Sequence, residues 1–179
     1  MEPIKIKEEK AYEIMKAKRG YKNRLASPRL LKVIVASGTG SGIKKDKNRN
    51  EFIIGRLAKI TGQKPATKSA KKSIASFKVR QGDPVGVMVT LRGARMYGFL
   101  DKLTNVAIPR MKDFRGIDTK IIDSIGNLTL PIREHTIFPE TGDEELKDVF
   151  GLAITIVTSA RTREEALEFF TLLGFPFKK

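Results

Sequence analysis

Residues 85–92 alternate between two kinds of side chain, and this pattern constrains the fold more than any other feature of the chain. Large apolar side chains stand at every second position, namely Val85, Val87, Val89 and Leu91. The positions between and after them hold Gly86, Met88, Thr90 and Arg92. Because successive side chains of a β-strand point to opposite faces of its sheet, one face is predicted to pack on a core and the other to meet a polar partner.

Further strands and helices are expected along the chain without strict alternation. Strands are expected at residues 30–36, 128–132 and 152–158, and helices at residues 7–19, 50–61, from 93 to Pro109, and after Thr162. Neither a repeat nor a linker between domains is evident. Residues 1–179 are therefore predicted to form a single α+β domain, with a mainly antiparallel sheet, helices packed on one face of it and a long basic hairpin loop.

Periodicity and end signals add detail to these elements. Gly20 and Gly62 are predicted to end the first two helices, and Thr162 with Glu165 forms a capping-box pattern before the last one. The strand at residues 30–36 places Leu31, Val33 and Val35 on one face. The helix at residues 50–61 is expected to bury Phe52, Ile53, Leu57 and Ile60, and the last helix Ala166, Phe169, Phe170 and Leu173.

The segment 64–95 is strongly basic. It holds five Lys and three Arg against a single acid, Asp83, which gives it a net charge of +7. Its middle, residues 70–82, is predicted to be an exposed loop that carries Lys71, Lys72, Lys78 and Arg80 around Ile74 and Phe77. Point charges for phosphates and an exposed aromatic ring for stacking are what RNA binding requires. A basic hairpin that is merely solvated fits the same composition, and the segment alone leaves both interpretations open.

The positive charge of the whole chain is concentrated in its first half. Of the net charge of +15, residues 1–95 carry +17 and residues 96–179 carry −2. The first half is therefore predicted to bind a polyanion. Nucleic acid fits better than a membrane surface, because no basic amphipathic helix with bulky apolar residues is evident.

Other functional classes lack the residues that they need. Cysteine is absent, which excludes disulfides and thiolate chemistry and fits a cytoplasmic protein. No apolar run approaches the ~20 residues of a membrane span, and the first ten residues lack an apolar signal core. His135 is the only histidine, so neither a metal site nor a Ser-His-Asp set is predicted, and no cofactor is expected.

Two local motifs have weaker interpretations. The glycines of residues 38–42 follow a strand, but Ile43 stands where the phosphate-loop and dinucleotide patterns both need glycine. A turn or a close backbone contact is the preferred interpretation. Residues 140–148 hold five acids, which predict either a solvated surface or a contact with a charged protein.

A family resemblance extends over nearly the whole chain. Its motifs are residues 61–65 (TGQKP), 70–75 (AKKSIA), 90–93 (TLRG), 113–116 (DFRG), 137–140 (IFPE) and 154–158 (ITIVT). In these ordered motifs the chain resembles large-subunit ribosomal protein five, of the bacterial type. This is the family that holds 5S ribosomal RNA in the central protuberance of the large subunit.

The resemblance implies a non-enzymatic ribosomal protein and a set of partners. These are 5S rRNA, 23S rRNA, peptidyl-site (P-site) tRNA, neighbouring 5S-binding ribosomal proteins, and a head protein of the small subunit at an intersubunit bridge. The expected rRNA contacts are Gln63, Lys64, Lys68, Thr90, Arg92 and Arg95. The expected tRNA contacts, in the basic loop, are Lys71, Lys72, Ser73, Phe77, Lys78 and Arg80.

One position departs from the family pattern. The first strand usually ends in Asn, Met and then Gly-x-Gly, whereas Ala36 and Ser37 precede Gly38 here. Alanine lacks the hydrogen-bonding groups of an asparagine amide, so Ser37, a backbone group or a local change in the RNA has to replace one 5S contact. An RNA-directed enzyme or assembly factor is the alternative function, and it would need a catalytic cluster beside the basic face.

Overall fold

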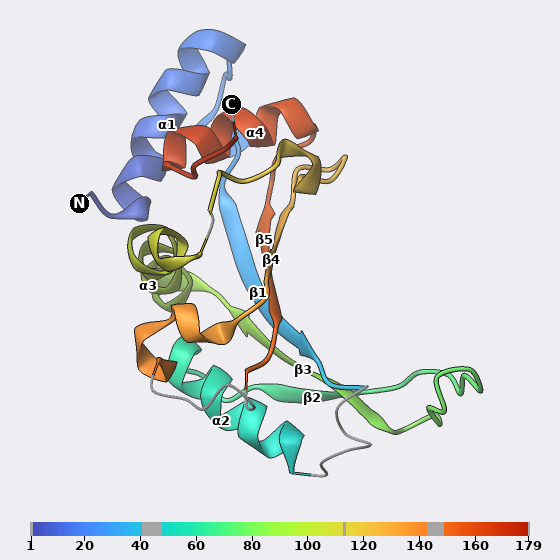
Figure 1. Cartoon of the computed structure of the whole chain (residues 1–179). Coiled ribbons are helices and arrows are strands. Elements are labelled where there is room, and N and C mark those ends of the chain that lie inside the picture. The colour runs from blue at the N-terminus through green and yellow to red at the C-terminus, as the bar shows by residue number, and fades with distance from the viewer. Residues whose placement is uncertain (1, 41–47, 113, 143–148, 179) are drawn as a thin grey trace. The chain divides into compact units, whose positions relative to one another are not determined.

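A computed structural model describes residues 2–40, 48–112, 114–142 and 149–178, and Figure 1 shows its course. The helices are α1 (Ile4–Arg19), α2 (Arg49–Thr61), α3 (Gly93–Lys102) and α4 (Arg163–Leu173). The strands are β1 (Leu30–Gly38), β2 (Ala66–Ser69), β3 (Pro84–Leu91), β4 (Leu128–Ile132) and β5 (Leu152–Thr158). The strands form one five-stranded sheet in the order β2-β3-β1-β5-β4, with β2 and β3 antiparallel. The predicted α+β fold with a mainly antiparallel sheet is confirmed.

The chain divides into two compact units. One comprises Met1–Val33, Arg92–Leu130 and Thr155–Lys179, and the other Ile34–Leu91 and Pro131–Ile154. Strands β1, β4 and β5 contribute residues to both units. That residues 1–179 act as a single domain stays a prediction.

The first unit contains α1, α3 and α4, and α1 packs against the other two. Asp101 of α3 accepts a hydrogen bond from the backbone nitrogen of Ile4 at 2.8 Å, which satisfies an N–H group at the start of α1. At the other end of α1, Lys18 and Arg19 bind Glu168 of α4. The hydrogen bond from Lys18, together with that from Arg19, lowers the pKa of Glu168.

The predicted cap of α4 is confirmed, with one difference. The Thr162 hydroxyl accepts from the backbone nitrogen of Glu165 at 3.2 Å, as a capping box requires. The Glu165 carboxylate, however, accepts from the nitrogen of Arg161 at 2.8 Å and from the hydroxyl of Tyr21. Burial and this bond to Glu165 raise the pKa of Tyr21. The four side chains predicted for the inner face of α4 are all buried: Ala166, Phe169, Phe170 and Leu173.

Glu8 connects three segments of this unit. Its carboxylate accepts from the backbone nitrogen of Leu30 at 2.9 Å and from the hydroxyl of Tyr97 at 2.7 Å. Burial, and then the bond to Glu8, raise the pKa of Tyr97. The start of β1 departs from the burial expected of regular alternation. Leu30 is the buried residue at the start of this strand, Leu31 is exposed, and regular alternation begins only at Val33.

We expect Glu8→Ala to lower the free energy of unfolding by about 1–3 kcal/mol, because it strands a partly buried N–H group and a partly buried hydroxyl. Glu9→Ala is the matched control, since Glu9 forms an exposed ion pair with Arg24 at 3.7 Å, and its cost should stay below about 0.5 kcal/mol. Urea unfolding of both variants measures the difference. Equal stability of the two variants would contradict the role given to Glu8.

The second unit contains α2, β2 and β3, and α2 packs on β3. The alternation predicted for β3 is confirmed from Val87 onward: Val87, Val89 and Leu91 are buried, whereas Met88 and Thr90 are only half-buried. Val85, near the start of the strand, is half-buried like its neighbour Gly86. In α2 the predictions for Ile53, Leu57 and Ile60 are confirmed. Phe52 is only half-buried; its ring contacts the Arg56 guanidinium, 4.9 Å from the ring centroid, and packs at a near-right angle with the ring of Phe150.

Candidate nucleic-acid interface

The basic loop is a hydrogen-bonded hairpin (residues 70–82) that extends beyond β2 and β3 (Figure 1). Ile74 and Val79 exchange backbone hydrogen bonds of 2.9 and 3.2 Å. Between them the chain turns through residues 75–78, where the nitrogen of Lys78 donates to the carbonyl of Ala75 at 2.9 Å. Lys78 takes a φ of 52°, which is unusual for a residue other than glycine. The backbone pairing therefore fixes which side chains stand at the tip.

The base of the hairpin is tied by Asp83. Its carbonyl accepts from the nitrogen of Ala70 at 2.8 Å, and its carboxylate accepts from the nitrogen of Arg80 at 2.8 Å. The hydroxyl of Ser73, predicted to contact tRNA, accepts from the nitrogen of Gln81 at 2.9 Å. The hairpin thus has more internal hydrogen bonding than its sequence suggested. The carboxylate of Asp83, the one acid of the basic segment, accepts a backbone hydrogen bond.

The positive side chains of the hairpin face solvent. Lys71, Lys72, Lys78 and Arg80 are all exposed or nearly so. Within the described residues, no ion pair engages any of these four. Phe77 at the tip is 68% exposed and Ile74 is 47% exposed, so these two apolar side chains do not anchor the loop in a core. The surface that results combines four cations with an exposed aromatic ring.

Four of the expected rRNA contacts lie in the same unit as the hairpin. The side-chain nitrogen of Gln63 donates to the carbonyl of Thr90 at 3.3 Å, so these two residues are in contact. Lys64 precedes β2 and Lys68 lies within it, and both are exposed. Thr90 is half-buried, on the face of β3 opposite the buried valines. The polar face of this strand and the edge strand β2 therefore form one continuous candidate surface.

Arg92 and Arg95 belong to the other unit. Arg92 is the N-cap residue of α3, Arg95 lies in the first turn of that helix, and both are exposed. Both arginines follow β3 directly in the chain.

Ala36 and Ser37, the two residues that depart from the family pattern, lie near the end of β1. Ser37 is buried, and its hydroxyl donates to the carbonyl of Gly151 at 2.7 Å. Ala36 points to the other face of the strand, as alternation requires. The Ser37 hydroxyl is therefore engaged within the fold, on the face of β1 opposite Ala36. Which group replaces the asparagine amide stays a prediction.

The glycine motif behaves as a strand end with a close backbone contact. Gly38 is the last residue of β1, and the nitrogen of Thr39 donates to the carbonyl of Val85 at 2.9 Å. Residues 41–47 lie outside the described residues, as does the part of the acidic segment at residues 143–148.

Neither a metal centre nor a membrane span is found where the structure describes the chain. No group of three His, Cys, Asp or Glu residues lies close enough to hold a metal ion there. Among the described helices, none has the length and apolar character to cross a membrane. His135 is buried and stacked on Phe150 with 4.0 Å between ring centroids, and its Nδ1 accepts from the backbone nitrogen of Phe150 at 3.3 Å.

Sequence reasoning missed the hydrogen-bonding role of Asp83 and the existence of a hollow beneath the hairpin. This hollow has a volume of about 840 Å³. It is lined by Gly40, Ala70, Lys71, Lys72, Ile74, Ser76, Phe77, Val79 and Val85. The Gly82-Asp83-Pro84 run was a usable signal for Asp83, because an aspartate between these residues is typical of a side chain that bonds a turn backbone. Nothing in the sequence indicates the hollow.

Comparison with known proteins identifies the family. A family described as ribosomal protein L5 matches residues 23–80, and the model for the C-terminus of that ribosomal family matches residues 84–177. The large ribosomal subunit protein uL5 of Kosmotoga olearia is 46% identical over 178 residues, which is 99% of this chain and 97% of that protein. The proteins of the same name from Halothermothrix orenii and Desulfatibacillum aliphaticivorans are 50% and 51% identical, each over 89% of this chain and over 88% and 89% of their own lengths.

Proposed function

The chain belongs to the ribosomal protein L5 family, a structural and non-enzymatic component of the large ribosomal subunit, and from this premise we propose that it binds 5S rRNA there. Family membership also confirms the predicted ribosomal location in the cytoplasm and removes the alternative of an RNA-directed enzyme. The finer roles below are proposals that the surface chemistry supports.

One observation carries the proposal: the exposed cations stand beside a polar strand face, and the only acid of segment 64–95 is bound to backbone. Gln63, Lys64, Lys68 and Thr90 supply charge and hydrogen-bonding groups on one surface. Phosphate contacts from the lysines fix the position of the RNA, and a rigid sheet decides which RNA surface fits. Arg92 and Arg95 extend this set at the start of α3.

The hairpin takes the second role, contact with P-site tRNA. Its backbone hydrogen bonds hold Lys71, Lys72, Lys78 and Arg80 outward, where each meets a phosphate as a point charge. Phe77 offers a ring on which a base stacks. Ser73 supports the hairpin through Gln81 in addition to any contact with RNA.

The remaining partners follow from the same premise. We assign the net positive charge of residues 1–63 to contact with 23S rRNA, and the neighbouring 5S-binding ribosomal proteins are the further partners in the large subunit. We assign the acidic segment 140–148 to the small-subunit head protein at the intersubunit bridge, since five acids repel phosphates. The segment is only partly described, and Glu140 within it is exposed.

Crosslinking in cells, followed by sequencing of the RNA recovered with the protein, tests the main proposal. We expect 5S rRNA to dominate the recovered RNA. A population without 5S rRNA would overturn the proposal.

Thr90→Val is predicted to weaken 5S binding by about 0.5–1.5 kcal/mol, which is roughly 2- to 12-fold in Kd, because it removes one hydroxyl and keeps the side-chain shape. Gln63→Ala should weaken binding similarly and also cost some stability, since Gln63 bonds the Thr90 backbone. Thr67→Val is the control, because Thr67 pairs with Val87 and so lies on the other face of the sheet. Titrations at fixed salt, paired with thermal melts, measure both effects. Unchanged affinity with lowered melting temperatures would show that Thr90 and Gln63 are structural.

A further inference from the structure

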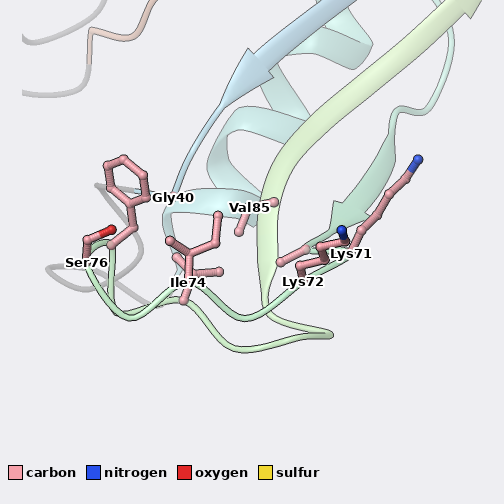
Figure 2. A pocket seen from close by; sticks show the side chains of 9 residues that line it. Gly40, Lys71, Lys72, Ile74, Ser76 and Val85 are labelled. Atoms are coloured by element: carbon pink, nitrogen blue, oxygen red, sulfur yellow. The ribbon is translucent and has the colours of Figure 1, made fainter.

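The hollow beneath the basic hairpin has an apolar lining and a basic rim. Six of its nine lining residues are apolar or glycine: Gly40, Ala70, Ile74, Phe77, Val79 and Val85. The others are Lys71, Lys72 and Ser76. Figure 2 shows Ile74 and Val85 in the middle of the lining residues, with the two lysines to one side of them and Ser76 to the other. Its volume of about 840 Å³ lies within the range of sites that bind ligands.

Backbone hydrogen bonds join several of the segments that line the hollow. Ile74 and Val79 are joined by their own pair of hydrogen bonds, and Val85 lies in β3 with its carbonyl bound to Thr39. Gly40 brings the end of β1 close, since a Cβ added at this glycine would lie 3.8 Å from the Cβ of Val85. The paired hairpin residues, β3 and the end of β1 therefore surround it.

We propose that this hollow is a docking site for an acidic protein segment that inserts one or two large apolar side chains. The apolar walls suit leucine or phenylalanine, which lose no hydrogen bonds when they leave water. The charge is complementary: the hairpin carries four cations, and the carboxylate of the adjacent Asp83 is bound to backbone. Acidic residues next to the apolar anchor meet Lys71 and Lys72, which lie together on one side of the hollow.

The lining favours a protein segment over a nucleobase. A base presents both hydrogen-bond donors and acceptors at its edge. The lining side chains include two lysines, which only donate, and one serine hydroxyl. Among these side chains, only the Ser76 hydroxyl could accept hydrogen bonds from the N–H groups of a base, whereas an apolar side chain needs no hydrogen-bond partner. A docked segment covers Lys71 and Lys72, so it excludes tRNA from the hairpin. The exclusion of tRNA rests on the proposed function of the hairpin. The docking of the segment does not depend on that function.

Fluorescence anisotropy with the full chain and a synthetic peptide tests the docking. The peptide carries one leucine and one phenylalanine at its centre and three acidic residues on each side. We expect saturable binding that is lost when the two central residues are replaced by serine, or when the acids are replaced by their amides. Ile74→Ser should raise Kd by about tenfold. Ile125→Ser, which removes a side chain of similar exposure outside the hollow, should leave Kd unchanged within about twofold.

A second measurement uses the unaltered chain and does not depend on how a variant folds. A photoreactive group at the central phenylalanine of the peptide should label Ile74, Phe77 or Val79. Labelling elsewhere, or no saturable binding at millimolar peptide, would overturn the proposal. A short single-stranded oligonucleotide that binds with the same tenfold dependence on Ile74, while the peptide does not, would also overturn it and make the hollow a nucleobase site. Failure of 5S binding in the crosslinking experiment would leave these results unaffected, so the two proposals fail separately.

Discussion

Binding of 5S rRNA by this chain should weaken by roughly 10³-fold or more when monovalent salt rises from about 50 to 200 mM. Residues 1–95 carry a net charge of +17, so an RNA surface of several phosphates is neutralised on binding. Each neutralised phosphate releases condensed counterions, and added salt opposes that release. Affinity titrations at four or five salt concentrations measure the slope of log K against log salt.

Single substitutions assign that slope to residues. Lys68→Gln on β2 should reduce the slope by about 0.7–0.9, the contribution of one phosphate contact. Lys120→Gln is the matched control, because Lys120 is also exposed but lies in the half of the chain with a net charge of −2. An affinity that stays flat across this salt range would contradict the electrostatic account. An equal change in both variants would show that only total charge matters.

The parts of the fold that were predictable are those fixed by local chemistry. Gly20 and Gly62 end their helices with φ of 67° each, a conformation that costs glycine little. The alternation in β3 predicted its buried face, because strand periodicity depends only on neighbouring residues. The capping box at Thr162 is equally local. In each case the determining residues lie close together in the chain.

The parts that were missed depend on residues far apart in the chain. Glu8 bonds Tyr97 across 89 positions and Leu30 across 22, and no periodic pattern of α1 marks it as shared. Leu31 was grouped with Val33 and Val35, yet it is 41% exposed at the start of β1, where Leu30 is the buried residue. Phe52 was assigned to the core, yet it is only half-buried. Its ring contacts Arg56 of the same helix and Phe150, which comes from a distant segment of the chain.

The candidate site divides in the same way. Its cations were predictable because charge is read directly from composition, and those in the hairpin face solvent. The hydrogen bonds that support these cations were not predictable from the sequence. The bond from the Arg80 nitrogen to the Asp83 carboxylate and the bond from the Gln81 nitrogen to the Ser73 hydroxyl both require the turn geometry of the folded hairpin. The hollow arises only when Gly40 and Val85 meet the hairpin, so it has no sequence signature.

Replacement of residues 69–81 by a short glycine-containing turn should preserve the fold and most of the 5S affinity while impairing tRNA retention. The ladder that joins β2 to β3 through residues 66–68 remains, and so does the α2–β3 packing. Four cations are removed, which should lower the salt slope of tRNA retention by about 3 and retention itself by about tenfold at low salt. The measurements are 5S binding by the purified variant and P-site tRNA retention on ribosomes that carry it.

A second variant separates charge from shape in this experiment. Changing Lys71, Lys72, Lys78 and Arg80 to glutamine removes the charge, while the Ile74–Val79 hydrogen bonds still form the hairpin. If both variants lose tRNA equally, the cations account for the contact. If only the truncated protein does, the hairpin acts through its shape and through Phe77, whose ring is 68% exposed. A collapse of 5S binding in the truncated protein, with a native circular dichroism spectrum, would instead make the hairpin part of the 5S site. The division between sheet and hairpin would then be wrong.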